Sequence, residues 1–75
     1  MNIVIVGDGK VGYTLAEQLS KEGHDITLID RNSAALQRTV EALDVIGVVG
    51  NGASYDIQIE AGVDQSDLLV AVTSQ

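Results

Sequence analysis

The stretch that decides the fold is Ile3-Val4-Ile5-Val6-Gly7-Asp8-Gly9-Lys10-Val11-Gly12. Its first four residues form an apolar run, and the three glycines that follow have the spacing G-x-G-x-x-G. Apolar residues then continue at helical spacing, at Val11, Leu15, Ala16 and Leu19. A strand, a tight glycine turn and a helix in direct succession are the context in which this spacing predicts a phosphate-binding βα unit.

A second strand is expected at residues 25–29 and ends on Asp30, which lies 18 residues beyond Gly12. In dinucleotide-binding folds a carboxylate at about 20 residues from the glycines accepts hydrogen bonds from the ribose. That carboxylate would repel a 2′-phosphate, so the sequence favours an adenine nucleotide other than NADP. Arg31 leaves alternatives open, because an arginine there can bind a 2′-phosphate, lie over the adenine or point into solvent.

Strand and helix patterns alternate along the whole chain. We expect strands at residues 2–6, 25–29, 45–49 and 68–72 and helices at 10–22 and 53–61, with a further helix that carries Leu36, Val40 and Leu43. Asn32 or Ser33 can cap that helix, and the other two are expected to end at Gly23 and Gly62. The strands are continuous apolar runs, which is typical of a parallel sheet buried on both faces. The sequence therefore predicts an α/β fold, a Rossmann-like doubly wound parallel sheet with strand order 3-2-1-4.

The 75 residues suffice for one small domain, so residues 1–75 are expected to form a single Rossmann-like nucleotide-binding domain. A complete doubly wound fold has about six strands, whereas only four are predicted here. We therefore expect an incomplete domain, truncated after the fourth strand. The outer edge of strand 68–72 would be bare and apolar, and it predicts edge-to-edge association or exchange of elements between copies.

Composition excludes several kinds of function. The net charge of −7 argues against nucleic-acid binding, and the lack of cysteine excludes disulfides and thiolate metal sites. No apolar run approaches the ~20 residues of a membrane span, and no signal peptide is recognisable, so we expect a cytoplasmic protein without membrane insertion. The single histidine, His24, is expected on the surface in a turn far from the site. No nucleophile–base pair or metal-ligand spacing is present, so no catalytic or metal-binding residue is predicted.

Each glycine of the first turn has a distinct expected role. Gly7 permits the turn out of the strand, Gly9 lets the backbone approach a pyrophosphate, and Gly12 lets the helix pack closely on the sheet. Lys10 can reach the far phosphates of ATP or ADP, or remain a solvated charge. Asp8 would repel phosphate unless it points away or holds a metal, and a solvated position is the plainer expectation.

Two further loops are expected at the same edge of the sheet. The loop at residues 50–54 leaves room for an adenine, and Asn51 offers amide groups to the edge of that base. Ser54 can instead cap the following helix. Thr73 follows the fourth strand beside the switch point between the first and fourth strands, where a ligand crosses the sheet edge.

Four stretches resemble the N-terminal nucleotide-binding part of RCK/KTN domains, and in particular the bacterial TrkA family: residues 5–12, 28–31, 49–54 and 61–73. The last two are more specific than the glycine triplet, because they resemble the family patterns G-[DN]-[AG]-[ST] and A-G-[IV]-x-x-[AS]-D-x-[LV]-[IV]-A-[VL]-T. The resemblance covers nearly the whole chain and about half of the family's N-terminal domain. It implies a cytosolic regulatory subunit of a Trk- or Ktr-type potassium transport system that gates ion uptake by binding ATP/ADP or NAD(H), and not an enzyme.

The resemblance also implies partners and site residues. It implies a homo-oligomer, a dimer or a larger ring, at the inner face of the cell membrane beneath a potassium-translocating membrane subunit. The cofactor-binding residues expected from motif and resemblance together are Gly7, Asp8, Gly9, Lys10, Val11, Gly12, Asp30, Arg31, Asn51, Gly52, Ala53 and Thr73. Two alternatives stay open: the N-terminal half of the cofactor domain of an NAD-dependent dehydrogenase, and a stand-alone Rossmann-like binding module.

Overall fold

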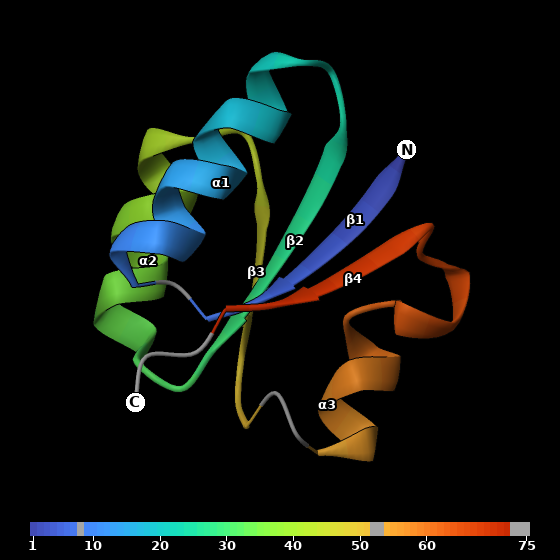
Figure 1. Ribbon diagram of the computed structural model, residues 1–75. Coiled ribbons are helices and arrows are strands. Elements are labelled where there is room, and N and C mark those ends of the chain that lie inside the picture. The colour runs from blue at the N-terminus through green and yellow to red at the C-terminus, as the bar shows by residue number, and fades with distance from the viewer. Residues whose placement is uncertain (8, 52–53, 73–75) are drawn as a thin grey trace.

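Strands and helices alternate in the computed structural model, which describes residues 1–7, 9–51 and 54–72. The elements are β1 (Asn2–Val6), α1 (Lys10–Lys21), β2 (Asp25–Asp30), α2 (Ser33–Ala42), β3 (Ile46–Val49), α3 (Tyr55–Glu60) and β4 (Leu68–Ala71) (Figure 1). A single 3₁₀ turn at Val63–Gln65 precedes β4. The predicted order of elements is confirmed, and each observed end lies within two residues of the predicted one.

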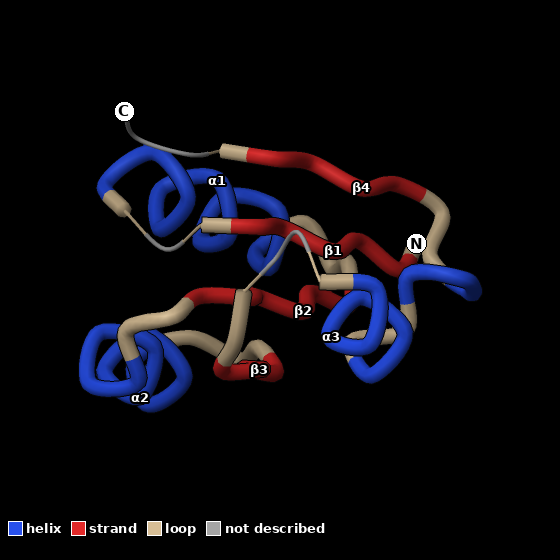
Figure 2. The backbone as a smooth tube through the Cα atoms, turned by 90° about the horizontal axis from the view of Figure 1, so that it is seen from below, coloured by secondary structure: helices blue, strands red, loops and turns tan. Residues whose placement is uncertain are grey.

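The four strands form one parallel sheet in the order β3-β2-β1-β4. In register, Val6 of β1 lies between Ile29 of β2 and Ala71 of β4. The helices α1 and α2 cover one face of this sheet and α3 covers the other (Figure 2). The predicted Rossmann-like α/β fold with strand order 3-2-1-4 is therefore confirmed.

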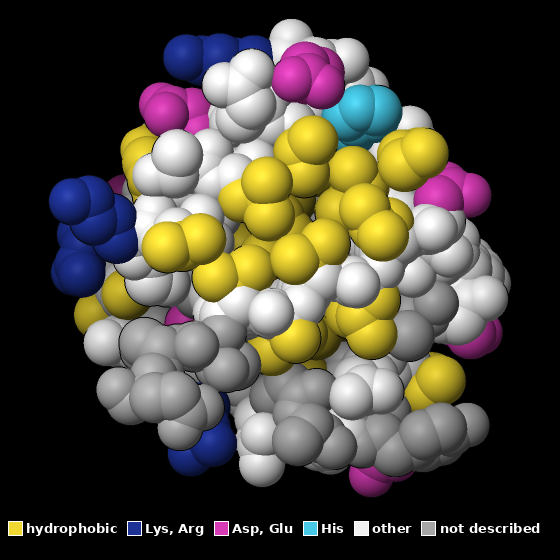
Figure 3. Space-filling model, viewed as in Figure 1, with side chains coloured by type: hydrophobic (Ala, Val, Ile, Leu, Met, Phe, Trp, Pro, Cys, Tyr) yellow, Lys and Arg dark blue, Asp and Glu magenta, His cyan; other side chains and the backbone are white. Residues whose placement is uncertain are grey.

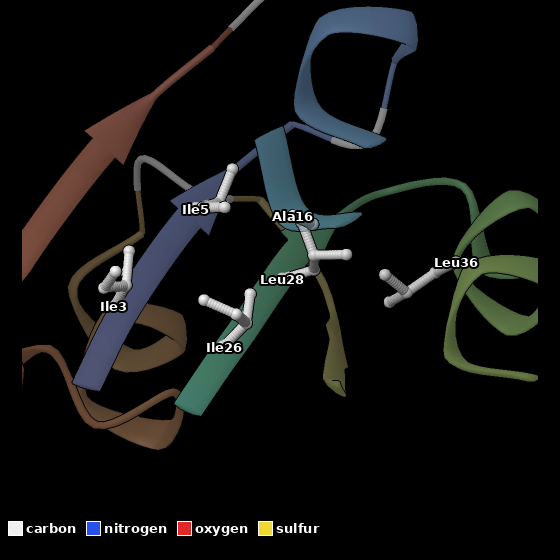
Figure 4. Close-up of a cluster of buried hydrophobic side chains, with 6 residues drawn as sticks. All are labelled: Ile3, Ile5, Ala16, Ile26, Leu28 and Leu36. Atoms are coloured by element: carbon white, nitrogen blue, oxygen red, sulfur yellow. The ribbon is translucent and has the colours of Figure 1, made fainter. Parts of the chain in front are cut away.

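The core consists of two clusters, one on each face of the sheet. On the face covered by α1 and α2, strand residues pack against both helices; the buried members are Ile3, Ile5, Ala16, Ile26, Leu28 and Leu36 (Figure 4). The cluster on the α3 face is smaller and centres on Val4, Ile29 and Val48. Because residues of both β1 and β2 enter both clusters, these two central strands are buried on both faces, as their largely apolar sequences predict.

The outer strands are not buried on both faces, and the bare apolar edge predicted for β4 is confirmed. On β3, Ile46 and Val49 are 65% and 51% exposed, and on β4, Leu68 and Leu69 are 46% and 43% exposed. Each outer strand has a neighbouring strand on one side only, and six-residue α3 is too short to cover the whole of its face. Apolar side chains accordingly gather on the side of the molecule where β4 lies (Figure 3).

We predict that this apolar edge drives association of the chain at high concentration. Light scattering after size-exclusion chromatography should detect dimers or larger species, since an apolar strand edge pairs readily with another copy. Leu69→Lys should shift the population toward monomer, because a charge on an edge strand opposes pairing. Ile59→Lys is the matched control, since Ile59 is similarly exposed at 41% but lies on α3. A strictly monomeric wild-type chain would refute the prediction.

Local sequence signals account for the helix ends. α1 ends just before Gly23, which has a φ of 89°, a conformation that a glycine adopts without strain. α2 begins after Asn32, whose side-chain oxygen accepts a hydrogen bond of 3.0 Å from the amide of Ala35. Of the two capping residues that the sequence allowed, Asn32 is therefore the one used.

This cap provides a small and specific test of the fold. Asn32→Ala should lower the free energy of unfolding by about 1 kcal/mol, because the amide of Ala35 loses its acceptor. Ser33→Ala is the control: Ser33 is the first residue of α2, is exposed, and alanine is the best helix former. Urea unfolding followed by circular dichroism measures both, and equal effects of the two substitutions would contradict the assignment of the cap.

Candidate functional site

The predicted binding residues gather where the parallel strands end. Three backbone hydrogen bonds continue the sheet pattern past the strand ends: the amide of Gly7 donates to Ile29 at 2.8 Å, that of Gly50 to Asp30 at 2.9 Å, and that of Val72 to Val6 at 2.8 Å. The loops that follow all four strands therefore begin side by side at the carboxyl edge of the sheet. In open α/β sheets this edge is where ligands bind.

The first glycine turn has the conformation that its sequence predicts. Gly7 has a φ of 106°, which bends the chain sharply out of β1 and strains any residue with a side chain. Gly12 is buried, and a Cβ added to it would overlap the carbonyl oxygen of Gly7 and lie 2.9 Å from the carbonyl carbon. The expectation that Gly12 permits close packing of helix and sheet is thus confirmed.

The N-terminus of α1 is left open by its sequence. Its N-cap is Gly9, which has no side chain to cap the helix, and the first helical hydrogen bond runs from the amide of Tyr13 to Gly9 at 2.8 Å. The amides of Lys10, Val11 and Gly12 precede that bond and so have no acceptor within the helix. Nothing in the described structure lies within 4 Å of a Cβ added to Gly9, so an anion can approach this helix end closely.

Asp30 is the last residue of β2 and lies at the same edge as Gly7. One carboxylate oxygen of Asp30 accepts a hydrogen bond of 2.8 Å from the amide of Asn32, which fixes the side chain at the start of the β2–α2 connection. The residue is partly exposed, so the carboxylate is accessible from solvent. Arg31, the next residue, is exposed. The geometry places this carboxylate at the end of the strand that pairs with β1, next to the glycine turn.

The loop after β3 begins at this edge and leads into α3. Asn51 is exposed, and its carbonyl accepts a hydrogen bond of 2.9 Å from the amide of Ser54. Ser54 occupies the N-cap position of α3, although its side chain makes no capping hydrogen bond. A Cβ added to Gly50 would lie 2.5 Å from Cδ1 of Ile57. A residue with a Cβ at position 50 would displace the side chain of Ile57, so packing against α3 favours glycine there whether or not the loop contacts a ligand.

The described part of the chain brings together Gly7, Gly9, Lys10, Val11, Gly12, Asp30, Arg31 and Asn51 at the carboxyl edge. The predicted site residues Asp8, Gly52, Ala53 and Thr73 lie outside the described residues. The third helix was expected at residues 53–61 and is observed at Tyr55–Glu60, which is a shorter span.

A groove of about 430 Å³ lies beside the open end of α1, and the sequence did not predict it. It is lined by Gly9 and the first turns of α1, and by α2 residues that include Arg38. Arg38 had no expected role, because only the packing of α1 against α2 brings it near Lys10. No signal in the linear sequence identifies such a pair.

His24 lies at the opposite, amino edge of the sheet, in the turn between α1 and β2, as predicted. It is partly buried; its Nδ1 is 3.1 Å from the amino group of Met1, and its Nε2 is 3.9 Å from a carboxylate oxygen of Glu22. A cavity of about 520 Å³ also lies at this edge, far from the glycine turn. The described residues contain no group of three side chains suited to hold a metal ion.

None of the helices in the described ranges has the length and apolar character needed to cross a membrane. Comparison with known families gives a match to the TrkA-N domain over residues 3–75. The chain is 42% identical to the Trk system potassium uptake protein TrkA of Azorhizobium caulinodans over 73 residues. It is 46% identical to the protein of that name from Haemophilus influenzae over 74 residues, and 38% identical to a TrkA homolog of Methanothermobacter thermautotrophicus over 73 residues.

These matches cover 97–99% of this chain. They cover only 16% of the Azorhizobium and Haemophilus proteins and 34% of the Methanothermobacter protein. The matched residues include the glycine turn, Asp30 and the loop after β3, which together form the carboxyl edge described above. With a family match over nearly its whole length, the chain belongs to the TrkA-N domain family.

Proposed function

We propose that this chain is the nucleotide-binding part of a regulatory subunit of a Trk-type potassium uptake system, and that it controls ion uptake by binding an adenine nucleotide. The proposal rests on family membership and on the names of the relatives, which are Trk system potassium uptake proteins. The observation that carries the nucleotide site is the open N-terminus of α1 behind Gly7, at the same edge as the Asp30 carboxylate.

The proposed site holds a nucleotide by two groups of contacts. The amides of Lys10, Val11 and Gly12 donate to phosphate oxygens, with the dipole of α1 adding a favourable field. Asp30 accepts hydrogen bonds from the ribose hydroxyls, and the loop that begins at Asn51 borders the adenine. ATP, ADP, NAD and NADH share these parts, so all four are candidate ligands, with Lys10 available for a distal phosphate.

We propose a sensor rather than an enzyme. Backbone amides and one carboxylate bind a nucleotide without supplying a nucleophile or a general base. A ligand then acts by its different affinity for two conformations of an assembly, and such coupling free energies are typically about 1–3 kcal/mol. The glycine turn and Asp30 would serve the cofactor domain of an NAD-dependent dehydrogenase equally well. Membership of the TrkA-N family is what favours the regulator.

The proposal includes partners and location. The full-length protein would be cytoplasmic, would form a homo-oligomer, and would contact a potassium-translocating membrane subunit at the inner face of the membrane. Residues 1–75 would act as one nucleotide-binding domain within it. Neither nucleic acid nor direct membrane insertion is part of the proposed function.

Calorimetric titration of the chain with ATP, ADP, NAD, NADH and NADP, each separately, tests the proposal. Saturable binding of ATP or ADP at least as tight as that of NADH would support the regulator. Strong preference for NAD or NADH, together with hydride transfer by the full-length protein, would support the dehydrogenase instead. If neither this chain nor the full-length protein binds any of the five, the nucleotide site is refuted.

A further inference from the structure

The groove between α1 and α2 is electrostatically unlike the rest of this acidic chain. The chain carries eleven carboxylates and four cations, lysine and arginine together, yet the groove is lined by two of the cations, Lys10 and Arg38. No aspartate or glutamate is among the described residues that line it. The amino-edge cavity differs in this respect, since Asp25 and Asp44 both line it. A positive groove on a chain of net charge −7 is a local feature that attracts anions.

The two cations have no partner of opposite charge in the described structure. Neither Lys10 nor Arg38 forms an ion pair there, and both are exposed. The hydroxyl of Thr14 donates to the carbonyl of Lys10 at 2.9 Å, and that of Thr39 donates to the carbonyl of Ala35 at 3.2 Å. Because these hydroxyl protons are used within the helices, the strongest donors that face the groove are the Lys10 ammonium and the Arg38 guanidinium.

The groove is continuous with the proposed phosphate site. Gly9, the N-cap of α1, lines it, and Lys10 is the first residue of that helix. An anion in the groove would therefore meet the positive end of the α1 dipole as well as the two side chains. A guanidinium binds phosphate through two parallel hydrogen bonds, and an ammonium adds a point charge.

From these observations we propose that the α1–α2 groove is a phosphate subsite in which Arg38 and Lys10 bind one phosphate group from two helices. The phosphate can be the distal group of a nucleotide held at the glycine turn, and this case rests on the proposed function. It can also be free inorganic phosphate, and this case does not depend on the proposed function. In both cases the anion links α1 to α2, and Arg38 is a binding residue that the motif does not contain.

Arg38→Gln is the test variant, because glutamine keeps the length and helix propensity of the exposed α2 position while removing the charge. Lys21→Gln is the matched control: Lys21 is an exposed cation at the other end of α1, outside the groove. Arg38→Lys keeps the charge without the two-pronged geometry. Circular dichroism establishes that each variant is folded before any titration.

The first arm of the experiment follows the amide signals of Tyr13, Thr14 and Thr39 by NMR while inorganic phosphate is added. The second arm measures the affinities for ATP and AMP by calorimetry. Because a charge-assisted pair of hydrogen bonds is lost, we expect Arg38→Gln to lower the affinity for the bound ligand about tenfold. The affinity of Arg38→Lys should lie between those of wild type and Arg38→Gln, and that of Lys21→Gln should equal that of wild type.

Loss of phosphate binding in Arg38→Gln, with ATP affinity unchanged, would identify free phosphate as the occupant. Loss of ATP affinity with AMP affinity unchanged would identify the distal phosphate of the nucleotide. The subsite is refuted if Arg38→Gln changes neither ligand, or if Lys21→Gln has the same effect. Arg38-dependent phosphate binding by a protein that binds no nucleotide would preserve the subsite and refute the proposed function, so the two can fail separately.

Discussion

Gly12→Ala should lower the free energy of unfolding by about 3 kcal/mol, the upper part of the range for overpacking in a well-packed interior. The new Cβ would overlap the carbonyl oxygen of Gly7 and lie 2.9 Å from its carbonyl carbon. Because the obstacle is backbone, no side-chain rotation relieves the overlap, and α1 must move away from the end of β1. The better helix propensity of alanine, worth about 1 kcal/mol, offsets only part of this cost.

Urea unfolding measures this loss, and Gly9→Ala is the matched control. Gly9 has a φ of −77°, which alanine also adopts, and nothing in the described structure lies within 4 Å of the added Cβ. We expect its stability to change by less than about 1 kcal/mol, while nucleotide affinity falls because the methyl group occupies the path of the phosphate. Equal destabilisation by the two substitutions would mean that the close approach of α1 to Gly7 is not what requires glycine at position 12.

The fold could be predicted because its local signals agree with one another. The strand patterns of β1 and β2, the tight turn expected at Gly7 and the helix end at Gly23 all depend on short-range sequence. The strand order then follows from the handedness of the crossovers. The bare apolar edge of β4 could also be predicted, from the strand order, but the exposure of β3 could not, because an apolar run indicates only that a strand can be buried.

The candidate site likewise contains features that the sequence could predict and features that it could not. The close contact of Gly12 with Gly7 and the position of Asp30 at the sheet edge follow from the spacing of the motif along the chain. Arg38 could not be assigned a role, because its place in the same groove as Lys10 depends on how α1 and α2 lie relative to one another. The 3₁₀ turn at Val63–Gln65 was also not predicted, because a segment of three residues is too short to show a helical period of apolar residues.

Asp30→Ala should weaken the binding of ATP, ADP and NADH by about 1–3 kcal/mol, or roughly 5- to 150-fold in Kd, because hydrogen bonds to a charged acceptor are lost. The affinity for NADP should fall less or should rise, since removing the carboxylate also removes its repulsion of a 2′-phosphate. Calorimetry on the same protein preparation gives all four affinities. Comparing NADH with NADP separates a lost ribose contact from a general loss of structure, which would weaken both.

Asp30→Asn provides the control for local structure. The carboxylate of Asp30 also accepts the amide of Asn32 at 2.8 Å, so alanine removes a contact that stabilises the start of the β2–α2 connection. Asparagine retains an oxygen acceptor for that amide but not the negative charge. If the charge acts on the ribose, Asp30→Asn should keep wild-type stability and still bind ATP and NADH more weakly. Unchanged affinity in both variants would remove Asp30 from the site and leave the ribose without a proposed protein contact.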